Sequence, residues 1–242
     1  ELSSYARKNY RKNGGRTAYL DLYCGTGRVR FRSSKEVADG CAVLSATTAL
    51  ASAPFDMVVI SDMDSGHAHA CGSRLSARGV DGVTALVGKA DEVVEQAIAQ
   101  LPRNALTQVL LDPYSLTALS FNTIERLSKL AHVDMVVHFS TYDMNRNLER
   151  YLPTGGLEHV APGATAAIET QLGVDAKRQR FFKHWCAQVE KLGLQVCDIV
   201  EKVLGPQNVN YYYLVLLYRH PLADRLWKAA KAAQAQRSFG FS

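Results

Sequence analysis

Residues Tyr19 to Arg28 read Y-L-D-L-Y-C-G-T-G-R, an apolar stretch that carries one carboxylate and then runs into two closely spaced glycines. This order predicts a buried β-strand followed by a tight turn, which is how a Rossmann-type sheet opens its nucleotide site. The glycines let the backbone turn below a bound nucleoside, and the N–H groups at the start of the next helix can face the polar end of the ligand. The decapeptide therefore favours an α/β sheet with a nucleotide site after its first strand.

The same turn argues against a dinucleotide ligand. A dinucleotide fingerprint carries a third glycine three residues after Gly27, and this chain has Arg30 there. The single carboxylate, Asp21, instead fits a ligand that brings a cationic amine. We take Asp21 as the candidate partner of that amine, with contacts to the ligand from Tyr23, Gly25 and Gly27 in the same turn.

Apolar runs alternate with helical stretches along the chain, which predicts parallel strands joined by helices. We expect strands at 17–23, 57–61, 83–87, 108–111 and 135–139, and helices at 42–52, 65–77, 90–100 and 120–131. An irregular stretch should follow from 142 to about 175, then a helix at 176–192. Two β segments, 195–203 and 211–218, end the pattern, joined by a hairpin turn at 205–208.

Five βα units with a terminal antiparallel hairpin resemble the order of class I methyltransferases. We therefore expect an α/β, Rossmann-like class I methyltransferase fold, with a mainly parallel sheet and a C-terminal antiparallel hairpin. The chain has 242 residues, of which 47% are hydrophobic, so we expect one methyltransferase-like domain over 1–242. Within it, 1–16 should form a basic helical extension and 142–192 a variable segment for substrate or partner.

Cysteine usage and hydropathy indicate the cellular compartment in which the protein works. No apolar run approaches the roughly 18 residues that span a bilayer, and we expect no membrane contact. The five cysteines form no C-x-x-C pair, so we expect free thiols, no zinc and a cytoplasmic protein. His67, His69 and Cys71 alternate, but a helix there would spread alternate residues around its axis, and we expect no metal site.

Charge is distributed unevenly along the chain. Residues 1–35 hold nine Lys and Arg against two acidic residues, and the last 24 residues hold five against one, around an acidic middle. Basic chain ends indicate a surface that meets an anion such as nucleic acid, although solvated surface charge explains them equally well.

Polar residues follow the second and third predicted strands, where a doubly wound sheet binds its ligand. Asp62 closes V-V-I-S-D in a place where a carboxylate can hydrogen-bond ribose hydroxyls, and Met63 beside it can lie against adenine. After the third strand, Gly88-Lys89-Ala90-Asp91 can border the adenine edge, with Ala90 as the candidate contact. The structural alternatives are that Asp62 or Asp64 caps the next helix, and that Asp91 does the same.

Asp112-Pro113-Tyr114 follows the fourth predicted strand. A carboxylate, a φ-restricting proline and an aromatic ring there can form a rigid wall beside a methyl donor. The three residues resemble the D-P-P-Y motif of amino-methyltransferases, in which the acid accepts a hydrogen bond from the target amine and the aromatic ring stacks on an extruded base. One proline of that motif is missing. In the structural alternative, Pro113 ends the strand and Tyr114 packs under a loop.

A basic insertion follows the glycine turn. It carries Arg28, Arg30, Arg32 and Lys35 and places Asp62 41 residues after Asp21, about twice the interval of about 20 usual between such a turn and its ribose acid. These side chains are well placed to contact phosphate groups at the mouth of the cleft. Alternatively, R-V-R-F-R lines one face of a short exposed strand.

Taken together, these motifs resemble the three-Cys-motif partner proteins, a bacterial group with a methyltransferase-like fold. The matching pieces are Y-L-D-L-Y-C-G-T-G-R, D-G-C-A-V-L-S-A, V-V-I-S-D-M-D, L-L-D-P-Y-S and Y-Y-Y-L-V-L-L-Y-R-H-P-L-A-D-R-L-W. The last block, a strand followed by an H-P-L helix start, is the most specific to the family. The chain departs from the family at Tyr23-Cys24-Gly25-Thr26-Gly27, where F-A-G-P-G is usual, and at Asp62, where Glu is expected. Lys89 also stands where the wider fold is often acidic.

The resemblance implies an S-adenosylmethionine site at Asp21, Gly25, Gly27 and Asp62, an acid at Asp112, and a radical-S-adenosylmethionine-like partner with three cysteines. The expected function is thus methyl transfer from S-adenosylmethionine to a nucleic-acid or nucleotide-like acceptor, together with a partner protein. The alternative is a non-catalytic partner or nucleic-acid-binding subunit that keeps the fold, in a setting such as phage defence.

Overall fold

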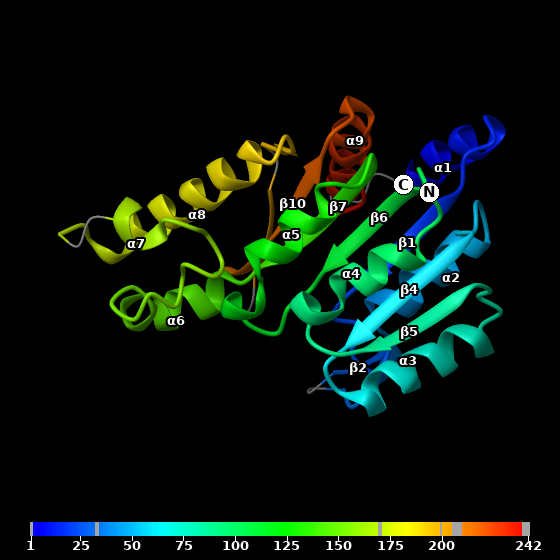
Figure 1. Ribbon diagram of the computed structural model, residues 1–242, viewed down its shortest axis with the longest axis horizontal. Helices are drawn as coiled ribbons and strands as arrows, with labels where there is room; N and C mark the ends of the chain where they lie inside the picture. The colour runs from blue at the N-terminus through cyan, green and yellow to red at the C-terminus, as the bar shows by residue number, and fades with distance from the viewer. Residues whose placement is uncertain (1, 32–33, 169–170, 199, 205–209, 239–242) are drawn as a thin grey trace.

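We describe a computed structural model of the chain, which covers residues 2–31, 34–168, 171–198, 200–204 and 210–238. Helices and strands alternate through most of it (Figure 1). The helices are α1 (Leu2–Lys12), α2 (Cys41–Leu50), α3 (Ser65–Ala77), α4 (Ala90–Gln100), α5 (Phe121–Leu127), α6 (Thr141–Tyr151), α7 (Ala164–Ala167), α8 (Val174–Lys191) and α9 (Pro221–Ser238), with a 3₁₀ turn η1 (Leu116–Ala118). The strands are β1 (Thr17–Asp21), β2 (Arg28–Arg30), β3 (Val37–Asp39), β4 (Met57–Asp62), β5 (Val83–Val87), β6 (Leu106–Leu111), β7 (His132–Phe139), β8 (Gln195–Val196), β9 (Glu201–Leu204) and β10 (Asn210–Tyr218).

The central sheet confirms the predicted fold class. Its strand order is β5-β4-β1-β6-β7-β10-β8, with β9 also paired to β10. The five strands from β5 to β7 run parallel, whereas β10 is antiparallel to β7, β8 and β9. In Figure 1 the arrows of β4, β5 and β6 point to the same end of the sheet. This is a Rossmann-like class I methyltransferase fold, and its carboxyl end is where such sheets bind ligands.

Alternating side chains divide the core into two layers. On one face, Leu20, Val59 and Val109 pack with α4, α5 and α8. On the other face, Tyr19 and Ile60 pack with α2 and α3. This alternation is what the two-residue period of a strand requires when both faces of a sheet are covered.

Three predictions about the second half of the chain were wrong. The stretch 142–175 was expected to be irregular, yet α6 occupies its first part and α7 lies within it, because the Gly- and Pro-rich sequence begins only after Tyr151. The strand expected at 195–203 is split into β8 and β9. The helix expected at 120–131 ends at Leu127, with Ser128 as its C-cap. The hairpin turn expected at 205–208 lies outside the described residues.

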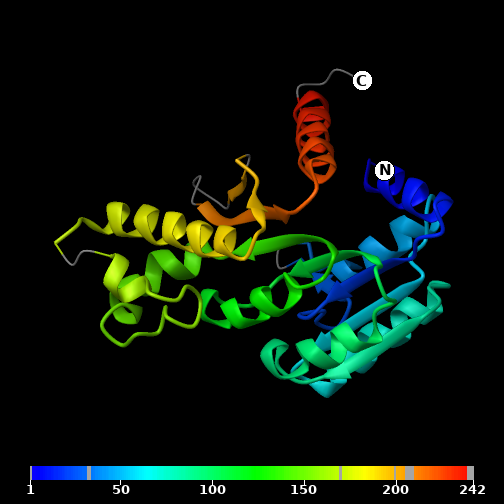
Figure 2. The same cartoon turned by 45° about the horizontal axis from the view of Figure 1, so that its top comes forward.

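Two groups of helices extend beyond the sheet. Both views place α6, α7 and α8 together at one end of the molecule, on the side away from β5 and α3 (Figures 1 and 2). Helix α9 stands out from the sheet in Figure 2, and it contacts α1. In the described part of the chain, no helix has both the length and the apolar character needed to cross a bilayer.

The cap of α6 gives a first testable prediction. Ser140 precedes α6 in extended conformation, and its hydroxyl accepts a hydrogen bond from the N–H of Asp143 at 3.2 Å. Ser140→Ala removes this cap, and we expect the free energy of unfolding to fall by about 1 kcal/mol. Chemical denaturation measures the change. Ser76→Ala, on the exposed side of α3, is the control and should cost little; an equal loss in both variants would contradict the capping role.

Candidate functional site

The turn after β1 is held open by its two glycines. Both have positive φ, +55° at Gly25 and +72° at Gly27. A Cβ at Gly27 would lie 2.9 Å from Val43 Cγ2 and 3.0 Å from Cys71 Sγ, so this glycine lets α2 and α3 pack against the turn. A Cβ at Gly25 would meet nothing within 4 Å, because Gly25 faces a cavity.

Asp62 links this turn to the end of β4. Its Oδ2 accepts a hydrogen bond from the Gly25 N–H at 3.0 Å, and its Oδ1 accepts one from the Asp64 N–H at 2.9 Å. His67 Nδ1 lies 3.4 Å from the same Oδ1. The cap of α3 is Asp64, which accepts from the His67 N–H, so Asp62 is not the capping residue and lines the cavity with Met63.

Asp21 lies below the cavity and not on its wall. Its side chain is buried, and it accepts hydrogen bonds from the Tyr23 N–H at 2.9 Å and the Tyr19 hydroxyl at 3.4 Å. Burial raises the pKa of Asp21 to about 7. The hydrogen bond from the Tyr23 N–H lowers this pKa, and the nearby negative charge of Asp112 raises it further. Asp21 thus fixes the backbone at Tyr23, whose ring borders the cavity.

Asp112, Pro113 and Tyr114 form the opposite wall. The Tyr114 side chain is 81% exposed, so it does not pack under a loop. Asp112 Oδ1 lies 2.8 Å from His138 Nδ1, and Cys41 Sγ donates to Asp112 Oδ2 at 4.0 Å. The wall therefore carries an acid–imidazole pair.

His138 is a site residue that the sequence reasoning missed. Leu111 pairs with Val137 in the parallel register of β6 and β7, so the next residues, Asp112 and His138, come side by side. The Tyr212 ring packs edge-on against the imidazole, with centroids 4.1 Å apart. A histidine near the end of the fifth parallel strand was the signal that could have identified it.

All these elements enclose one cavity of about 1010 Å³ at the carboxyl end of the sheet. Gly88, Lys89 and Ala90, at the start of α4, complete its side next to Asp62. Asp91 also lines it, and its carboxylate accepts from the Thr123 hydroxyl and lies 3.5 Å from His159 Nε2. Two of the predicted cofactor residues, Asp21 and Gly27, support the cavity from behind its wall.

The predicted phosphate contacts lie on a separate hairpin. Arg28 and Arg30 are exposed on β2, which pairs with β3, so the basic stretch forms a short exposed strand. Neither lines the cavity. Arg32 lies outside the described residues.

The basic ends of the chain are partly used within the fold. Arg7 is buried and donates to the Ala53 carbonyl and the Gln108 side chain. Arg11 pairs with Asp56 at 2.9 Å, and Lys228 bridges Asp198 and Asp224. Three of the fourteen basic residues that indicated an anionic partner therefore serve to hold α1 and α9 in place.

Two groups of candidate metal ligands differ in arrangement. His67, His69 and Cys71 lie on α3, with Cys71 buried and both histidines exposed. Cys197, Asp198 and Asp224 place their ligand atoms within 4.8 Å of one another. The Lys228 ammonium forms an ion pair with each carboxylate of this second group, at 3.0 Å from Asp198 and 2.9 Å from Asp224.

Comparison of the structure finds similar solved folds among methyltransferases. An rRNA methylase from Streptococcus thermophilus is 10% identical over 84% of this chain and 86% of its own, with a TM-score of 0.43. The O-methyltransferase TomG from Streptomyces achromogenes, solved in complex with SAM, is 16% identical over 89% and 78%, with a TM-score of 0.49. An O-methyltransferase from Bacillus cereus, solved in complex with SAH, is 11% identical over 89% and 79%, with a TM-score of 0.48. No protein-family model and no curated protein sequence matches the chain.

Proposed function

We propose that this protein is an S-adenosylmethionine-dependent methyltransferase that acts on a nucleic-acid or nucleotide-like acceptor. The observation that carries the proposal is the continuous cavity at the carboxyl end of the sheet that is lined both by Gly25 and Asp62 and by Asp112 and Tyr114. Its volume, about 1010 Å³, suffices for a nucleoside cofactor and part of an acceptor.

In this proposal the side of the cavity lined by Gly25, Asp62 and Met63 binds the cofactor. Asp62 accepts hydrogen bonds from the ribose hydroxyls through the lone pairs that Gly25 and Asp64 leave free. Met63 and Ala90 lie along the adenine. Asp21 acts through the Tyr23 amide that it holds, and so positions the turn beneath the cationic amine.

The wall formed by Asp112, Pro113 and Tyr114 binds the acceptor in this proposal. Bound S-adenosylmethionine supplies a sulfonium methyl group, and the acceptor atom that takes this methyl must lose a proton. Asp112 accepts a hydrogen bond from that atom and, with His138 at 2.8 Å, takes up the proton. Tyr114, exposed at the rim, offers a stacking surface for a planar ring. Holding the acceptor in line with the methyl group supplies most of the rate enhancement.

Isothermal titration with S-adenosylmethionine tests the cofactor site. Asp62→Ala removes the ribose acceptor and the anchor of the Gly25 N–H, and we expect affinity to fall about tenfold or more. Asp62→Asn, which keeps one acceptor oxygen, should lose less. Asp81→Ala, an exposed acid before β5, is the matched control and should bind like wild type. No binding by the wild-type protein would contradict the proposal.

A second candidate, a non-catalytic nucleic-acid-binding subunit, is favoured by the exposed arginines Arg28 and Arg30. Nucleic-acid binding that weakens steeply with salt, in a protein that binds no cofactor, would support it. The family resemblance adds a three-Cys-motif, radical-S-adenosylmethionine-like protein as the proposed partner. The five free thiols fit the reducing cytoplasm, where we place the protein.

A further inference from the structure

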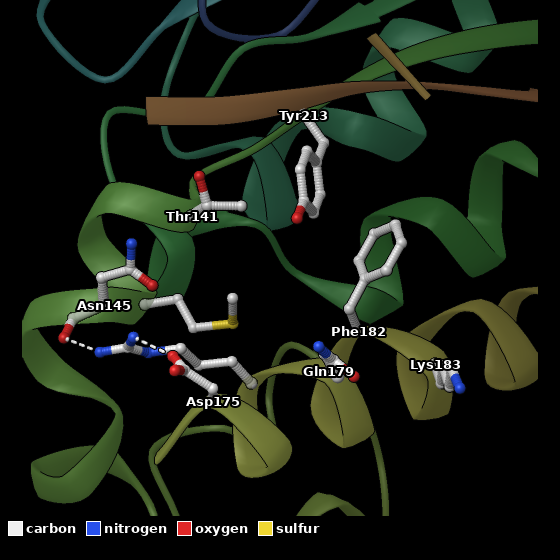
Figure 3. Close-up of a pocket in the computed structure, with 9 residues that line it drawn as sticks. Thr141, Asn145, Asp175, Gln179, Phe182, Lys183 and Tyr213 are labelled. Carbon is white, nitrogen blue, oxygen red and sulfur yellow. Dashed lines mark hydrogen bonds and ion pairs between the residues drawn. The ribbon is translucent and has the colours of Figure 1, made fainter. Parts of the chain in front are cut away.

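A second cavity of about 430 Å³ lies between α6, α8 and β10 (Figure 3). None of the residues that line it lines the first cavity. Its walls come from the segment after β7 and from the strand that pairs with β7, so it belongs to the same end of the sheet as the candidate active site.

Flat apolar groups form part of this second cavity. Phe182 lies beside the Tyr213 ring, with centroids 5.0 Å apart and ring planes at 62°. Met144 also lines the cavity and is buried. Behind Phe182, the Trp185 ring is stacked at a centroid distance of 6.0 Å and supports it from the core. A planar ring can therefore find an aromatic and thioether surface in this cavity.

Polar groups without partners border the same space. In the part of the chain that the structure describes, the side-chain amides of Asn145 and Gln179 and the Tyr213 hydroxyl make no hydrogen bond. Figure 3 shows the Tyr213 hydroxyl directed into the cavity and Asn145 on the wall beside Thr141. Such side-chain amides can donate and accept at once, which is what the edge of a nucleobase requires.

Two of the three charged residues that line this cavity, Asp175 and Arg178, are paired with one another, whereas the exposed Lys183 forms no ion pair with any described residue. Arg178 donates to Asp175 Oδ1 at 2.9 Å and to the Asn145 carbonyl at 2.8 Å. These two bonds tie α8 to α6 and neutralise the guanidinium. The lining therefore combines hydrogen-bonding groups for the edge of a ring with one ammonium, that of Lys183, which can meet a phosphate group.

Strand β10 connects the two cavities. Tyr212 packs against His138 of the first cavity, and the next residue, Tyr213, borders the second. Successive residues of a strand point to opposite faces, so the cavities lie on either side of this one strand. Beside them, Tyr142 and Tyr211 pack edge-on at 5.2 Å, and the Arg146 guanidinium lies over the Tyr142 ring.

We infer that the second cavity binds a nucleobase that flanks the methylated group of the acceptor. This inference rests on the proposed function, which supplies a nucleotide-like acceptor. The base packs against the apolar surface of Phe182 and Met144, and its edge meets the amides of Asn145 and Gln179 and the Tyr213 hydroxyl. The ring can belong to a nucleic-acid strand or to a free nucleotide, because both present the same chemistry.

Fluorescence of Trp185 reports on this cavity. In a Trp227→Phe background, Trp185 is the only tryptophan, and we titrate the full chain with nucleoside monophosphates and with short mixed-sequence single-stranded oligonucleotides. Asn145→Leu with Gln179→Leu keeps the apolar volume and removes both amides, and we expect about tenfold weaker binding. Gln96→Leu, on the exposed side of α4, is the matched control and should bind like its parent.

The outcomes separate this inference from the proposed function. Equal binding by the double variant and its parent, or no binding of either probe, would overturn the nucleobase site even if S-adenosylmethionine binds. Base binding without S-adenosylmethionine binding would leave this site in place and remove the methyltransferase proposal. Much tighter binding of oligonucleotides than of monophosphates would assign the base to a strand, and equal binding would assign it to a free nucleotide.

Discussion

Asp112→Asn is expected to lower the rate of methyl transfer about a hundred- to ten-thousandfold while S-adenosylmethionine binds almost as in wild type. The substitution keeps the shape of the side chain but removes the carboxylate that lies 2.8 Å from His138 Nδ1, and with it the proposed proton acceptor. His138→Gln should reduce the rate in the same direction and change its pH dependence. Single-turnover transfer of a radiolabelled methyl group to mixed-sequence RNA and single-stranded DNA measures both rates.

The matched control is His69→Gln, on the exposed side of α3, which should leave the rate unchanged. A retained rate in Asp112→Asn would show that the acceptor needs no base at this wall. Wild-type protein that binds S-adenosylmethionine and methylates neither probe would instead direct the search to other acceptors.

Stability should fall as pH rises from about 4 to about 7 because of Asp21. Its pKa is raised from 3.8 to about 7 by burial in the folded protein, so within this window the folded state holds a proton that the unfolded state has lost. By linkage, the free energy of unfolding decreases with pH there, by on the order of 4 kcal/mol at most for this group. Asp21→Asn keeps an acceptor for the Tyr23 N–H and removes the titration, so its stability should stay flatter across the same range.

Chemical denaturation of both proteins at a series of pH values isolates the contribution, because the two proteins differ only in the group at position 21. Asp81→Asn, at an exposed position, should follow the wild-type curve. A constant difference between wild type and Asp21→Asn from pH 4 to 8 would show that Asp21 ionises in the folded protein as it does in water.

The sequence predicted the parallel half of the fold well, since apolar runs bounded by glycine and aspartate mark buried strands clearly. Strand β5 and helices α3 and α4 lie at the predicted positions. Helix α6 was missed because it is mostly polar and buries only a narrow stripe that includes Met144 and Leu148. Its start depends on the Ser140 cap, a local signal that the Gly- and Pro-rich sequence after Tyr151 outweighed in the prediction.

The candidate site was predictable where a functional residue stands directly at the end of a parallel strand. Asp62, Met63 and the residues 112–114 all lie on the cavity for this reason. Pairings across strands were not predictable, because the partner of Asp112 depends on the register between β6 and β7. Counting charges along the sequence also could not predict which basic residues the fold uses, such as Arg7, which is buried and donates to Gln108.

The two backbone hydrogen bonds of Asp62 determine how costly it is to order this loop. Because one carboxylate holds both Gly25 and Asp64, the turn after β1 and the segment after β4 are fixed to each other while the chain folds. Little conformational entropy remains to be lost when a nucleoside arrives, and this favours tight association through few contacts. A ligand that fits only after the loop rearranges would have to break both hydrogen bonds, so the rigid loop also selects ligands by their shape.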